Sequence, residues 1–515
     1  MSGMLPKGWM EVSIGEIAFV SLGKTPSKKD YLSNGSLKVI KFRDVNNGVV
    51  DFFNDKTGFV RVDEAVVTSM TELKMWDVLT TSAAHSGENI GKKTAIVTEL
   101  PEKFERVFFT GELLNVRIPN HFLGFEIVSK MIYYFLSSEA GYKGIQKAVA
   151  GVHLTQGRAK GILFPLPPLN EQKRIVAKVD AIMPRIDSAK ERLEKIPAIL
   201  KRFRQSVLTA AVTGKLTEKW REDHPDMERA DFALSIVSKK VADSYLNVFE
   251  ETQTYPLPDT WLYVPLENLG EVRGGGTPSK SRADFWSGAI PWISPKDMKV
   301  CKIKNGKDFI SETALHESSV KMIPAGSILF VVRGMILAHS FPVALTMNDV
   351  TINQDMKGLT PNENVNCEYF LCVFKYMKTQ VLSYVKEATH GTLRLEMPVV
   401  QTFAVPLPPL DEQKEIVRQV DKLFALADKV EEHYQKARVQ VDALVQSVLA
   451  KAFRGELVPE DPDDEPAEKL LQRIQEEKAK MENELKTVSR SARGTRRNGT
   501  KTQRAGAEEK QAGEP

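Results

Sequence analysis

Hydroxyl and ammonium side chains follow a glycine turn at two places in the sequence, where they could donate hydrogen bonds to an anionic ligand. The residues concerned are Lys24, Thr25, Ser27 and Lys28 after Gly23, and Thr277, Ser279 and Lys280 after Gly275 and Gly276. Such donors suit phosphate oxygens, and glycine lets a backbone approach a ligand closely. A solvated hairpin loop is the alternative interpretation, but the repetition of the pattern favours a binding site.

Other basic and amide side chains could contact the edges of nucleic-acid bases. Arginine and glutamine present paired groups that match base edges, whereas lysine and hydroxyl groups serve phosphates. The further candidates are Lys41, Arg43, His85, Lys92, Lys93, His153 and Thr155 in the first half, and Lys296, Arg333, Gln354, Lys357, His390 and Arg394 in the second. As alternatives, Arg333 could end an apolar strand, Gln354 and Lys357 could cap one, and a lone histidine is usually structural.

The sequence lacks the patterns of common catalytic and metal sites. A phosphate-binding loop needs GxxxxGK[ST], but Ala18 stands where the first glycine before Gly23 should be. No HExxH motif occurs, and no methyltransferase-like glycine loop follows a strand. The acidic residues 461–465 lie among prolines and indicate a solvated linker. Because the three cysteines form no CxxC pair, a zinc site is not expected either.

Length and composition indicate a soluble protein of several domains. A chain of 515 residues is expected to form about two to four units. A membrane span needs about 20 uninterrupted apolar residues, but the best candidate, residues 328–338, is short and contains Arg333. The first nine residues lack the apolar core of a signal peptide. We therefore expect a cytoplasmic protein, in which a net charge of only +4 makes any anion-binding surface local.

An internal repeat determines the expected architecture. The motif Leu-Pro-x-x-Trp, the glycine turn, a Pro-Leu-Pro-Pro-Leu-[Asn/Asp]-Glu-Gln-Lys run and a Ser-Val-Leu segment each occur twice in the same order. The matching segments are residues 5–9 with 257–261, 23–28 with 275–280, 165–173 with 406–414, and 206–208 with 447–449. The sequences between them diverge, so we predict two unlike globular heads, each followed by a similar segment.

Each of these similar segments is predicted to be a long helix. Apolar residues recur at alternating spacings of four and three, which is typical of a coiled-coil seam. The seam residues are Ile175, Val179, Ile182, Ile186, Leu193 and Leu200 in the first helix, and Ile416, Val420, Leu423, Val430, Val441 and Leu444 in the second. Asn170 and Asp411 suit the N-cap, and Gly214 and Gly455 suit the chain just past each C-terminus.

Two prolines conflict with a straight first helix. Pro184 and Pro197 lie inside it, and an interior proline costs about 3 kcal/mol, so we expect a kink or a break. The second helix has Ala425 and Arg438 at the corresponding positions and should be straighter. An alternative is that each helix simply packs on its own head, although both are predicted to exceed the usual length of about 12 residues.

The order of heads and helices predicts how the chain is arranged. If the two seams pair with each other, the helices must run antiparallel with a head at each end, and each would span roughly 60 Å. We thus expect an α+β protein with two mixed α/β domains separated by a two-helix coiled coil. The predicted segments are head one at 1–168, the first helix at 169–213, a linker with a helix at 214–255, head two at 256–409, the second helix at 410–454 and a charged tail at 455–515.

The tail has two parts. Residues 467–488 form a charged stretch with a weak apolar stripe, which predicts a helix. Residues 489–515 are poor in apolar residues and predict disorder. Their arginines and lysines could add salt-sensitive affinity for nucleic acid, or could serve only as a solubilising end. An antiparallel second helix would bring the tail beside head one.

The repeated motifs resemble those of the specificity subunit family of type I restriction–modification enzymes. The likeness lies in the Pro-Leu-Pro-Pro-Leu run before each helix, in Gly275–Lys280, in Pro291–Asp297 and in Ile352–Met356. It extends over residues 1–458. The first head departs from the pattern, since it has Gly23-Lys24 instead of two glycines and Val39–Asp44 at the second motif.

The resemblance implies a function and a set of partners. Each head would be a target recognition domain that reads one half of a bipartite, asymmetric site in double-stranded DNA. The helices would set the spacing and dock two modification subunits, which bind S-adenosylmethionine and methylate adenine. Two restriction subunits, motor–nucleases that use ATP and magnesium, would join for cleavage. This chain would bind no cofactor and catalyse no reaction.

Two other functions remain open from the residues alone. An autonomous DNA-modifying enzyme would need catalytic motifs that this sequence lacks. A non-catalytic scaffold, whose two heads bind protein partners rather than DNA, needs no such motifs.

Overall fold

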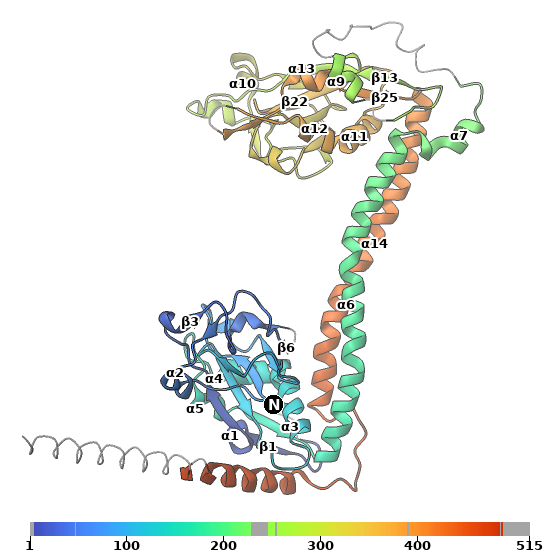
Figure 1. Ribbon diagram of the computed structural model, residues 1–515. Coiled ribbons are helices and arrows are strands. Elements are labelled where there is room, and N and C mark those ends of the chain that lie inside the picture. Colours follow the sequence, from blue (N-terminus) through green and yellow to red (C-terminus); the bar gives the residue numbers. More distant parts are fainter. Residues whose placement is uncertain are drawn as a thin grey trace, which may run out of the picture. The chain divides into compact units, whose positions relative to one another are not determined.

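The computed structural model describes residues 5–46, 48–227, 246–252, 255–388, 391–484 and 486–487. It divides into two compact units that each combine distant parts of the sequence. Unit 1 consists of Met1–Leu193 with Ala437–Pro515, and unit 2 consists of Glu194–Lys436. Each unit therefore contains one head together with part of both long helices (Figure 1).

The head of unit 1 is built on short, mostly antiparallel sheets. Two four-stranded sheets have the orders β10-β4-β7-β3 and β2-β11-β8-β9, while β1 pairs with β12 and β5 with β6. The strands are β1 Met10–Ser13, β2 Phe19–Leu22, β3 Tyr31–Leu32, β4 Leu37–Ile40, β5 Val45–Asn46, β6 Val49–Val50, β7 Phe59–Val60, β8 Val78–Thr81, β9 Thr94–Ile96, β10 Arg106–Phe109, β11 Leu113–Arg117 and β12 Leu163–Leu166. The helices are α1 Ile14–Ile17, α2 Glu64–Ser69, α3 Phe125–Ser137, α4 Glu139–Ala148 and α5 Gln156–Lys160.

The head of unit 2 has a comparable plan. Its sheets have the orders β14-β22-β19-β20-β16 and β17-β15-β21-β18, while β13 pairs with β25 and β23 with β24. The strands are β13 Leu262–Pro265, β14 Gly270–Gly274, β15 Ile290–Ile293, β16 Lys302–Ile303, β17 Asp308–Ile310, β18 Met322–Ile323, β19 Ile328–Val331, β20 Val343–Thr346, β21 Val350–Ile352, β22 Met356–Pro361, β23 Lys386–Glu387, β24 Leu393–Arg394 and β25 Ala404–Leu407. The helices are α7 Glu218–Glu222, α9 Leu246–Glu251, α10 Glu312–Glu317, α11 Cys367–Tyr376, α12 Lys378–Ser383 and α13 Met397–Gln401.

The register of one strand pair shows that the sequence repeat is also a structural repeat. Glu11 lies opposite Pro165 in the β1–β12 pair, and Tyr263 lies opposite Pro406 in the β13–β25 pair. In unit 1 the Ile14 N–H donates to the Ile162 carbonyl at 2.9 Å. In unit 2 the equivalent Leu266 N–H donates to the Phe403 carbonyl at 3.0 Å. Positions can therefore be compared between the units one by one.

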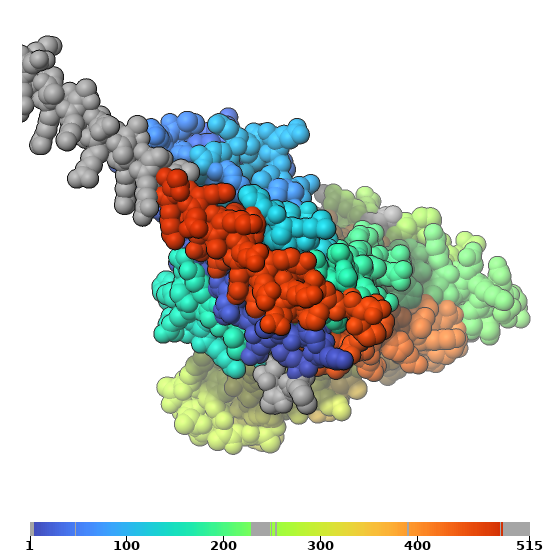
Figure 2. Space-filling view, turned by 90° about the horizontal axis from the view of Figure 1, so that it is seen from below, coloured from blue at the N-terminus to red at the C-terminus, as the bar shows by residue number. Residues whose placement is uncertain are grey.

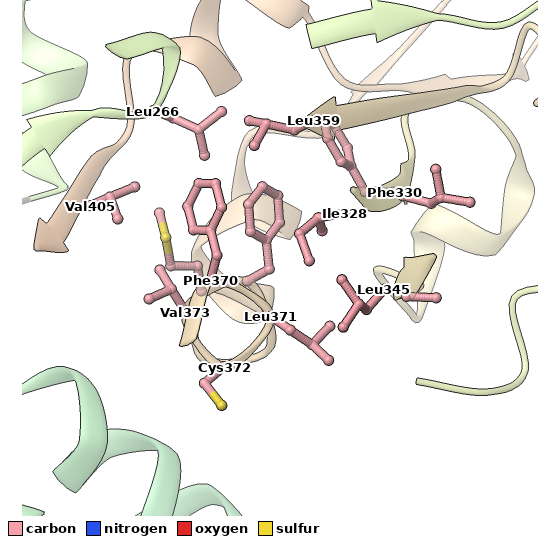
Figure 3. Close-up of a cluster of buried hydrophobic side chains, with 14 of the residues drawn as sticks. Leu266, Ile328, Phe330, Leu345, Leu359, Phe370, Leu371, Cys372, Val373 and Val405 are labelled. Atoms are coloured by element: carbon pink, nitrogen blue, oxygen red, sulfur yellow. The ribbon is translucent and has the colours of Figure 1, made fainter. Parts of the chain in front are cut away.

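The core of unit 2 forms where α11 packs on the large sheet (Figure 3). Phe330 of β19 and Phe370 of α11 are fully buried, and Phe370 and Phe374 lie edge to face with centroids 5.2 Å apart. Full burial of such a side chain contributes roughly 1.5–3 kcal/mol. This packing fixes strands β14, β19 and β22, whose ends carry the candidate residues of unit 2.

Two long helices continue from the heads. Helix α6 spans Leu169–Val212, 44 residues, and α14 spans Leu410–Ala452, 43 residues. Both begin one residue earlier than Asn170 and Asp411, so the predicted N-caps are wrong. The proline before each helix supplies the first accepting carbonyl, since Gln172 N–H donates to Pro168 and Gln413 N–H to Pro409 at 2.9 and 3.0 Å. Gly214 and Gly455 follow the helices with φ of 74° and 73°, as predicted.

The helices pair with each other within each unit and run antiparallel (Figure 1). In unit 1, Lys190 near the middle of α6 forms an ion pair of 3.0 Å with Asp442 of α14. In unit 2, Arg204 of α6 donates to Asp428 and Glu431 of α14 at 2.7 and 2.9 Å. The predicted pairing of the two helices is confirmed, and the first turns of each also join the core of the head they follow.

The seam prediction is right at the helix ends and wrong at two positions. Ile175, Val179, Ile186, Leu200, Ile416 and Val420 are buried, while Ile182, Leu193, Leu423 and Val441 are half-buried. Val430 and Leu444 are 40% and 46% exposed and belong to no continuous seam. A two-helix pair covers less of each helix than a globular core does, so apolar spacing alone overstates burial there.

Of the kink or break expected in the first helix, the break does not occur. Pro184 and Pro197 both lie inside the uninterrupted α6. Proline removes one helical hydrogen bond, but both prolines are exposed, so water can satisfy the carbonyl that each leaves without a donor. The pairing of α6 with α14 on either side of Pro184 and Pro197 compensates for the lost helical hydrogen bonds.

The tail returns to unit 1. Residues 467–484 are helical, and Ala467, Leu470 and Ile474 are buried in the same core as Trp9 and Phe135. Figure 2 shows this segment lying across the N-terminal residues of the head. Residues 489–515, for which disorder is predicted, lie outside the described residues, as does residue 488. Within the described part of the chain, no helix is both long and apolar enough to cross a membrane.

Candidate nucleic-acid interface

The repeated tryptophan and glutamate anchor each long helix to its head. The Trp9 Nε1–H donates to Glu171 Oε2 at 2.8 Å, and the Trp261 Nε1–H donates to Glu412 Oε2 at the same distance. Both carboxylates are buried. The motifs that reveal the repeat are thus mainly structural, because they connect the first strand of a head to the start of the helix that follows it.

The two glutamates differ in their second partner. In unit 2, Glu412 Oε1 accepts from Thr217 at 2.6 Å and from the guanidinium of Arg221. In unit 1, Glu171 Oε1 is buried without a hydrogen-bond partner among the described residues. Burial raises the pKa of the Glu171 carboxyl above its usual value, because the charged form is desolvated.

The glycine turns lie against the end of a neighbouring strand in both units. A Cβ at Gly275 would come within 2.2 Å of the Ile352 and Asn353 carbonyl oxygens, and a Cβ at Gly23 within 2.2 Å of the Thr110 carbonyl oxygen. No other residue fits so close an approach. The following N–H groups, of Gly276 and Lys24, donate to Ile352 and Phe109 at 2.9 and 3.1 Å.

The polar side chains after these glycines lie at the surface. Thr277 donates to Gln354, which brings two predicted residues together, and the Thr25 hydroxyl accepts from the Gly111 N–H at 3.2 Å. Ser27 donates to Asp30 at 2.5 Å, and Ser279 bonds Ser281 at 2.8 Å. The remaining residues of these turns are the exposed cations Lys24, Lys28 and Lys280, which have no carboxylate at ion-pair distance in the described ranges.

A second turn presents one exposed cation in each unit. Asp297 accepts from the Ser294 N–H at 2.9 Å, and Asp44 accepts from the Lys41 N–H at 2.7 Å, so both turns close in the same way. Burial raises the pKa of the Asp44 carboxyl. Between the paired residues lie Arg43 and its counterpart Lys296, which are both exposed.

Two of the predicted lysines brace the second turn of unit 1. Lys93 donates to the Phe42 carbonyl at 3.3 Å and to Asn46 Oδ1 at 3.0 Å. The Lys41 ammonium lies 4.5 Å from the centroid of the Tyr31 ring. These contacts hold Arg43 at the tip of the turn, next to the exposed ring of Phe42, which is 39% exposed.

A third part of the surface joins strand β19 to β24. The Arg333 side chain donates to Asp355 Oδ1 at 2.6 Å. The main chain of Arg333 forms an isolated antiparallel β-bridge with that of Arg394. Ala83 forms the equivalent bridge with His153 in unit 1. The predicted residues Arg333, Arg394 and His153 thus lie at equivalent main-chain pairs in the two heads, although Ala83, the counterpart of Arg333, was not predicted and carries no charge.

The glycine turn, the second turn and the β-bridge region lie at one edge of each head. In unit 2 these segments come directly after β14, β15 and β19 and directly before β22. The ends of β14 and β19 lie beside the start of β22, since Gly274 pairs with Lys357 and Val331 pairs with Met356. Gly274 leaves space for the Lys357 ammonium, which a Cβ there would approach to 2.8 Å. In unit 1 they follow β2, β4 and β8. The structure therefore gathers residues that are far apart in sequence into one polar, mainly basic surface per head.

Several predicted residues have other roles or contribute less. Thr155 accepts from the Arg158 N–H at 3.4 Å and caps α5, so it is a helix cap. Lys92 donates to Asn89 Oδ1 at 3.0 Å. His85 and His153 are exposed, and His390 lies outside the described residues.

Sequence reasoning missed a group of lysines beside Lys296. Lys299, Lys304 and Lys307 line a cavity of about 500 Å³ together with Lys296. The signal was present as five lysines within residues 296–307. It was overlooked because short loops rich in lysine are usually only solvated.

The described residues provide no group of three side chains that could hold a metal ion. The three cysteines are free. Two mixed α/β heads, each with a basic strand-end surface and each anchored to a pair of antiparallel helices, define a two-headed recognition protein.

Comparisons with known proteins give the family. Residues 6–198 and 258–439 match the family described as the type I restriction modification DNA specificity domain. The match covers most of the chain in two copies, and the chain belongs to this family.

Named relatives and solved structures agree with this assignment. The chain is 29% identical over 494 residues to the type I restriction enzyme EcoKI specificity subunit of Escherichia coli K12, covering 93% of this chain and 97% of that protein. It is 32% identical over 351 residues to the EcoBI specificity subunit of Escherichia coli, covering 64% and 67%. The HsdS subunit from Thermoanaerobacter tengcongensis shares the fold, with a TM-score of 0.54 and 18% identity over 88% of this chain and 99% of that one.

A chain from a structure of a type I restriction–modification system is also similar in fold. Its TM-score is 0.62 at 18% identity, covering 88% of this chain and all of that chain. Family membership accounts for the two heads, the internal repeat and the paired helices together.

Proposed function

We propose that this chain is the DNA sequence-specificity subunit of a type I restriction–modification complex. Each head reads one half of a bipartite, asymmetric duplex site, and the paired helices set the spacing between the halves. The chain has a recognition role and carries no catalytic site of its own.

One observation carries this proposal. The strand ends of each head collect exposed cations and amide groups on a single surface, as seen at Arg43 in unit 1 and at Lys296, Arg333 and Gln354 in unit 2. Lysine and arginine neutralise phosphates, while arginine and glutamine can bind base edges. The two surfaces differ in sequence, which supports an asymmetric target.

The proposal includes partners that supply the chemistry. Two modification subunits dock on the paired helices and bind S-adenosylmethionine, and two restriction subunits bind ATP and magnesium. The complex acts on double-stranded DNA in the cytoplasm, and this chain binds none of these cofactors itself.

The test uses the assembled methyltransferase complex and footprinting on duplex DNA. We expect two protected segments separated by an unprotected gap. Arg43→Ala should weaken protection of one segment, and Lys296→Ala that of the other, each by about five- to tenfold in affinity through loss of one phosphate or base contact.

Matched controls are exposed lysines away from the strand-end surfaces. Lys103→Ala in unit 1 and Lys378→Ala in unit 2 remove one positive charge each and should leave both protected segments unchanged. A complex that assembles but protects no duplex would instead identify the heads as protein-binding modules of a scaffold.

A further inference from the structure

Unit 1 contains a large groove that does not belong to the strand-end surface. Its volume is about 1110 Å³, and it lies between helix α4, strand β12 and the end of α14. Leu163, Pro165 and Phe453 form its apolar part. Leu163 is 54% exposed, which is unusual for a leucine within a strand of the head.

The internal repeat shows what fills the equivalent place in unit 2. There, Ala404, Pro406 and Val212 stand where Leu163, Pro165 and Phe453 stand in unit 1. Helix α9, Leu246–Glu251, together with Thr252 and Tyr255, lies at these positions. Val248 packs against the core of unit 2, and the Tyr255 ring lies 6.1 Å from Tyr376 and 6.0 Å from Tyr263 between centroids.

This covering segment makes hydrogen bonds to two main-chain groups. The Ala404 N–H donates to the Thr252 hydroxyl at 2.9 Å. The Tyr255 hydroxyl donates to the Val212 carbonyl, the last of α6, at 3.2 Å. Main-chain hydrogen bonds are a recurring source of affinity for a bound segment, and pockets for its side chains add specificity.

The same two main-chain groups have no partner among the described residues in unit 1. Ser13 and Leu163 face each other in the β1–β12 register, and the Ile14 N–H bonds Ile162 across the strands. The Leu163 N–H therefore points away from β1, towards the groove. No described residue accepts from it, and none donates to the Phe453 carbonyl.

The groove of unit 1 carries positive charge, whereas the segment that covers the equivalent positions of unit 2 carries negative charge. Lys147 and Arg158 line the groove, and in the described part of the chain no carboxylate lies at ion-pair distance from either. The covering segment of unit 2 carries Glu250 and Glu251. The chain's own residues 488–515 are mainly basic and poor in apolar side chains, so they do not suit this groove.

We propose that the groove of unit 1 is a docking site for an acidic, amphipathic helical segment of a partner protein, which is followed by a residue with a hydroxyl group and by a tyrosine. The segment accepts a hydrogen bond from the Leu163 N–H and donates one to the Phe453 carbonyl, as Thr252 and Tyr255 do for Ala404 and Val212. This site is separate from the DNA-reading surface and does not depend on it.

The experiment uses the full chain and a labelled synthetic peptide of residues 246–257, which has the required chemistry. Fluorescence anisotropy should show saturable binding, and hydrogen exchange should show new protection of the Leu163 amide and of residues 139–148. Leu163→Asp should weaken binding at least about tenfold, because it places a charge on the apolar floor of the groove.

A matched control is Leu123→Asp, at an apolar position of the same unit that is 89% exposed, and it should not change the binding. Absence of saturable binding, equal binding to the Leu163→Asp variant, or new protection confined to residues 378–383 of unit 2 would overturn the proposal. Self-association of the chain that Leu163→Asp abolishes would assign the groove to a second copy and also overturn it.

Discussion

At the scale of residues, the motifs that are easiest to recognise prove to be anchors rather than reading groups. Trp9 with Glu171 and Trp261 with Glu412 fix the helices. The neighbouring glutamines act similarly, since Gln172 donates to the Pro167 carbonyl and Gln413 to the Pro408 carbonyl at 2.8 and 2.9 Å. The residues proposed to read DNA are less regular, as expected if each head recognises a different sequence.

The two buried glutamates predict losses of different size for the same substitution. Glu412→Gln should destabilise unit 2 by about 3 kcal/mol, because it leaves the half-buried guanidinium of Arg221 without its buried carboxylate partner. Glu171→Gln should cost less than about 1 kcal/mol, because the Gln oxygen still accepts from Trp9 and no cation loses a hydrogen bond. Urea denaturation of the two variants at neutral pH measures the difference, and equal losses would contradict it.

The pH dependence of the Glu171 variant has a definite sign. Burial raises the pKa of Glu171 above 4.5 in the folded state, so the folded chain binds the proton more tightly than the unfolded chain does. The contribution of this group to stability is therefore present below its ordinary pKa and lost as the pH rises through the raised value. Relative to the parent chain, Glu171→Gln should gain stability between pH 4 and the neutral range, as followed by urea denaturation at several pH values. A constant difference would contradict the shift.

At the scale of elements, the long helices are determined by contacts at both of their ends. The last turns of α6, including Val207 and Ala211, join the core of unit 2, and those of α14, including Val448 and Ala452, join the core of unit 1. This explains why an uninterrupted helix survives two internal prolines, since packing at each end outweighs their local cost.

Removal of either proline should stabilise α6. Pro184→Ala and Pro197→Ala each restore a main-chain donor at an exposed helical position and should raise the free energy of unfolding by about 1–3 kcal/mol. The matched change Ala425→Pro in α14 should lower it by a similar amount. Chemical denaturation followed by circular dichroism measures both, and a loss on Pro184→Ala would show that the proline is needed.

The tail helix is an integral part of unit 1. Ile474 is fully buried in the core of the head, so Ile474→Ala should destabilise unit 1 by about 2–4 kcal/mol. The exposed neighbour Glu476 is a suitable control, and Glu476→Ala should change stability by less than about 0.5 kcal/mol. Thermal unfolding of the two variants compares them, and equal effects would show that the tail packs only weakly.

At the scale of the whole molecule, duplication explains the architecture. Each unit is completed by residues from distant parts of the chain, since unit 1 needs the end of α14 and the tail while unit 2 needs the end of α6. Neither head would keep its full core as a continuous fragment. Each of the two long helices therefore contributes residues to both units.

The paired helices predict a relation between their length and the DNA target. Insertion of one heptad in α6 and one in α14 adds about 10 Å of helix, which equals about three base pairs at 3.4 Å each. We expect the methyltransferase complex to prefer a gap longer by about this amount, measured by methylation of DNA libraries with varied spacing. An unchanged preferred gap would contradict the role of the helices as a spacer.

The sequence by itself determined the repeat, both long helices, the glycine turns and the family, because these depend on local spacing and on motifs that occur twice. The tertiary structure alone decided that Thr155 is a cap, that Lys93 braces a turn, that Val430 and Leu444 are exposed and that Ile474 completes unit 1. These outcomes depend on which distant segments bury one another. The spacing of apolar residues along the chain does not say which other segment a given residue will contact. For the same reason the groove beside Leu163 exists only in the folded unit, where α4, β12 and the end of α14 come together.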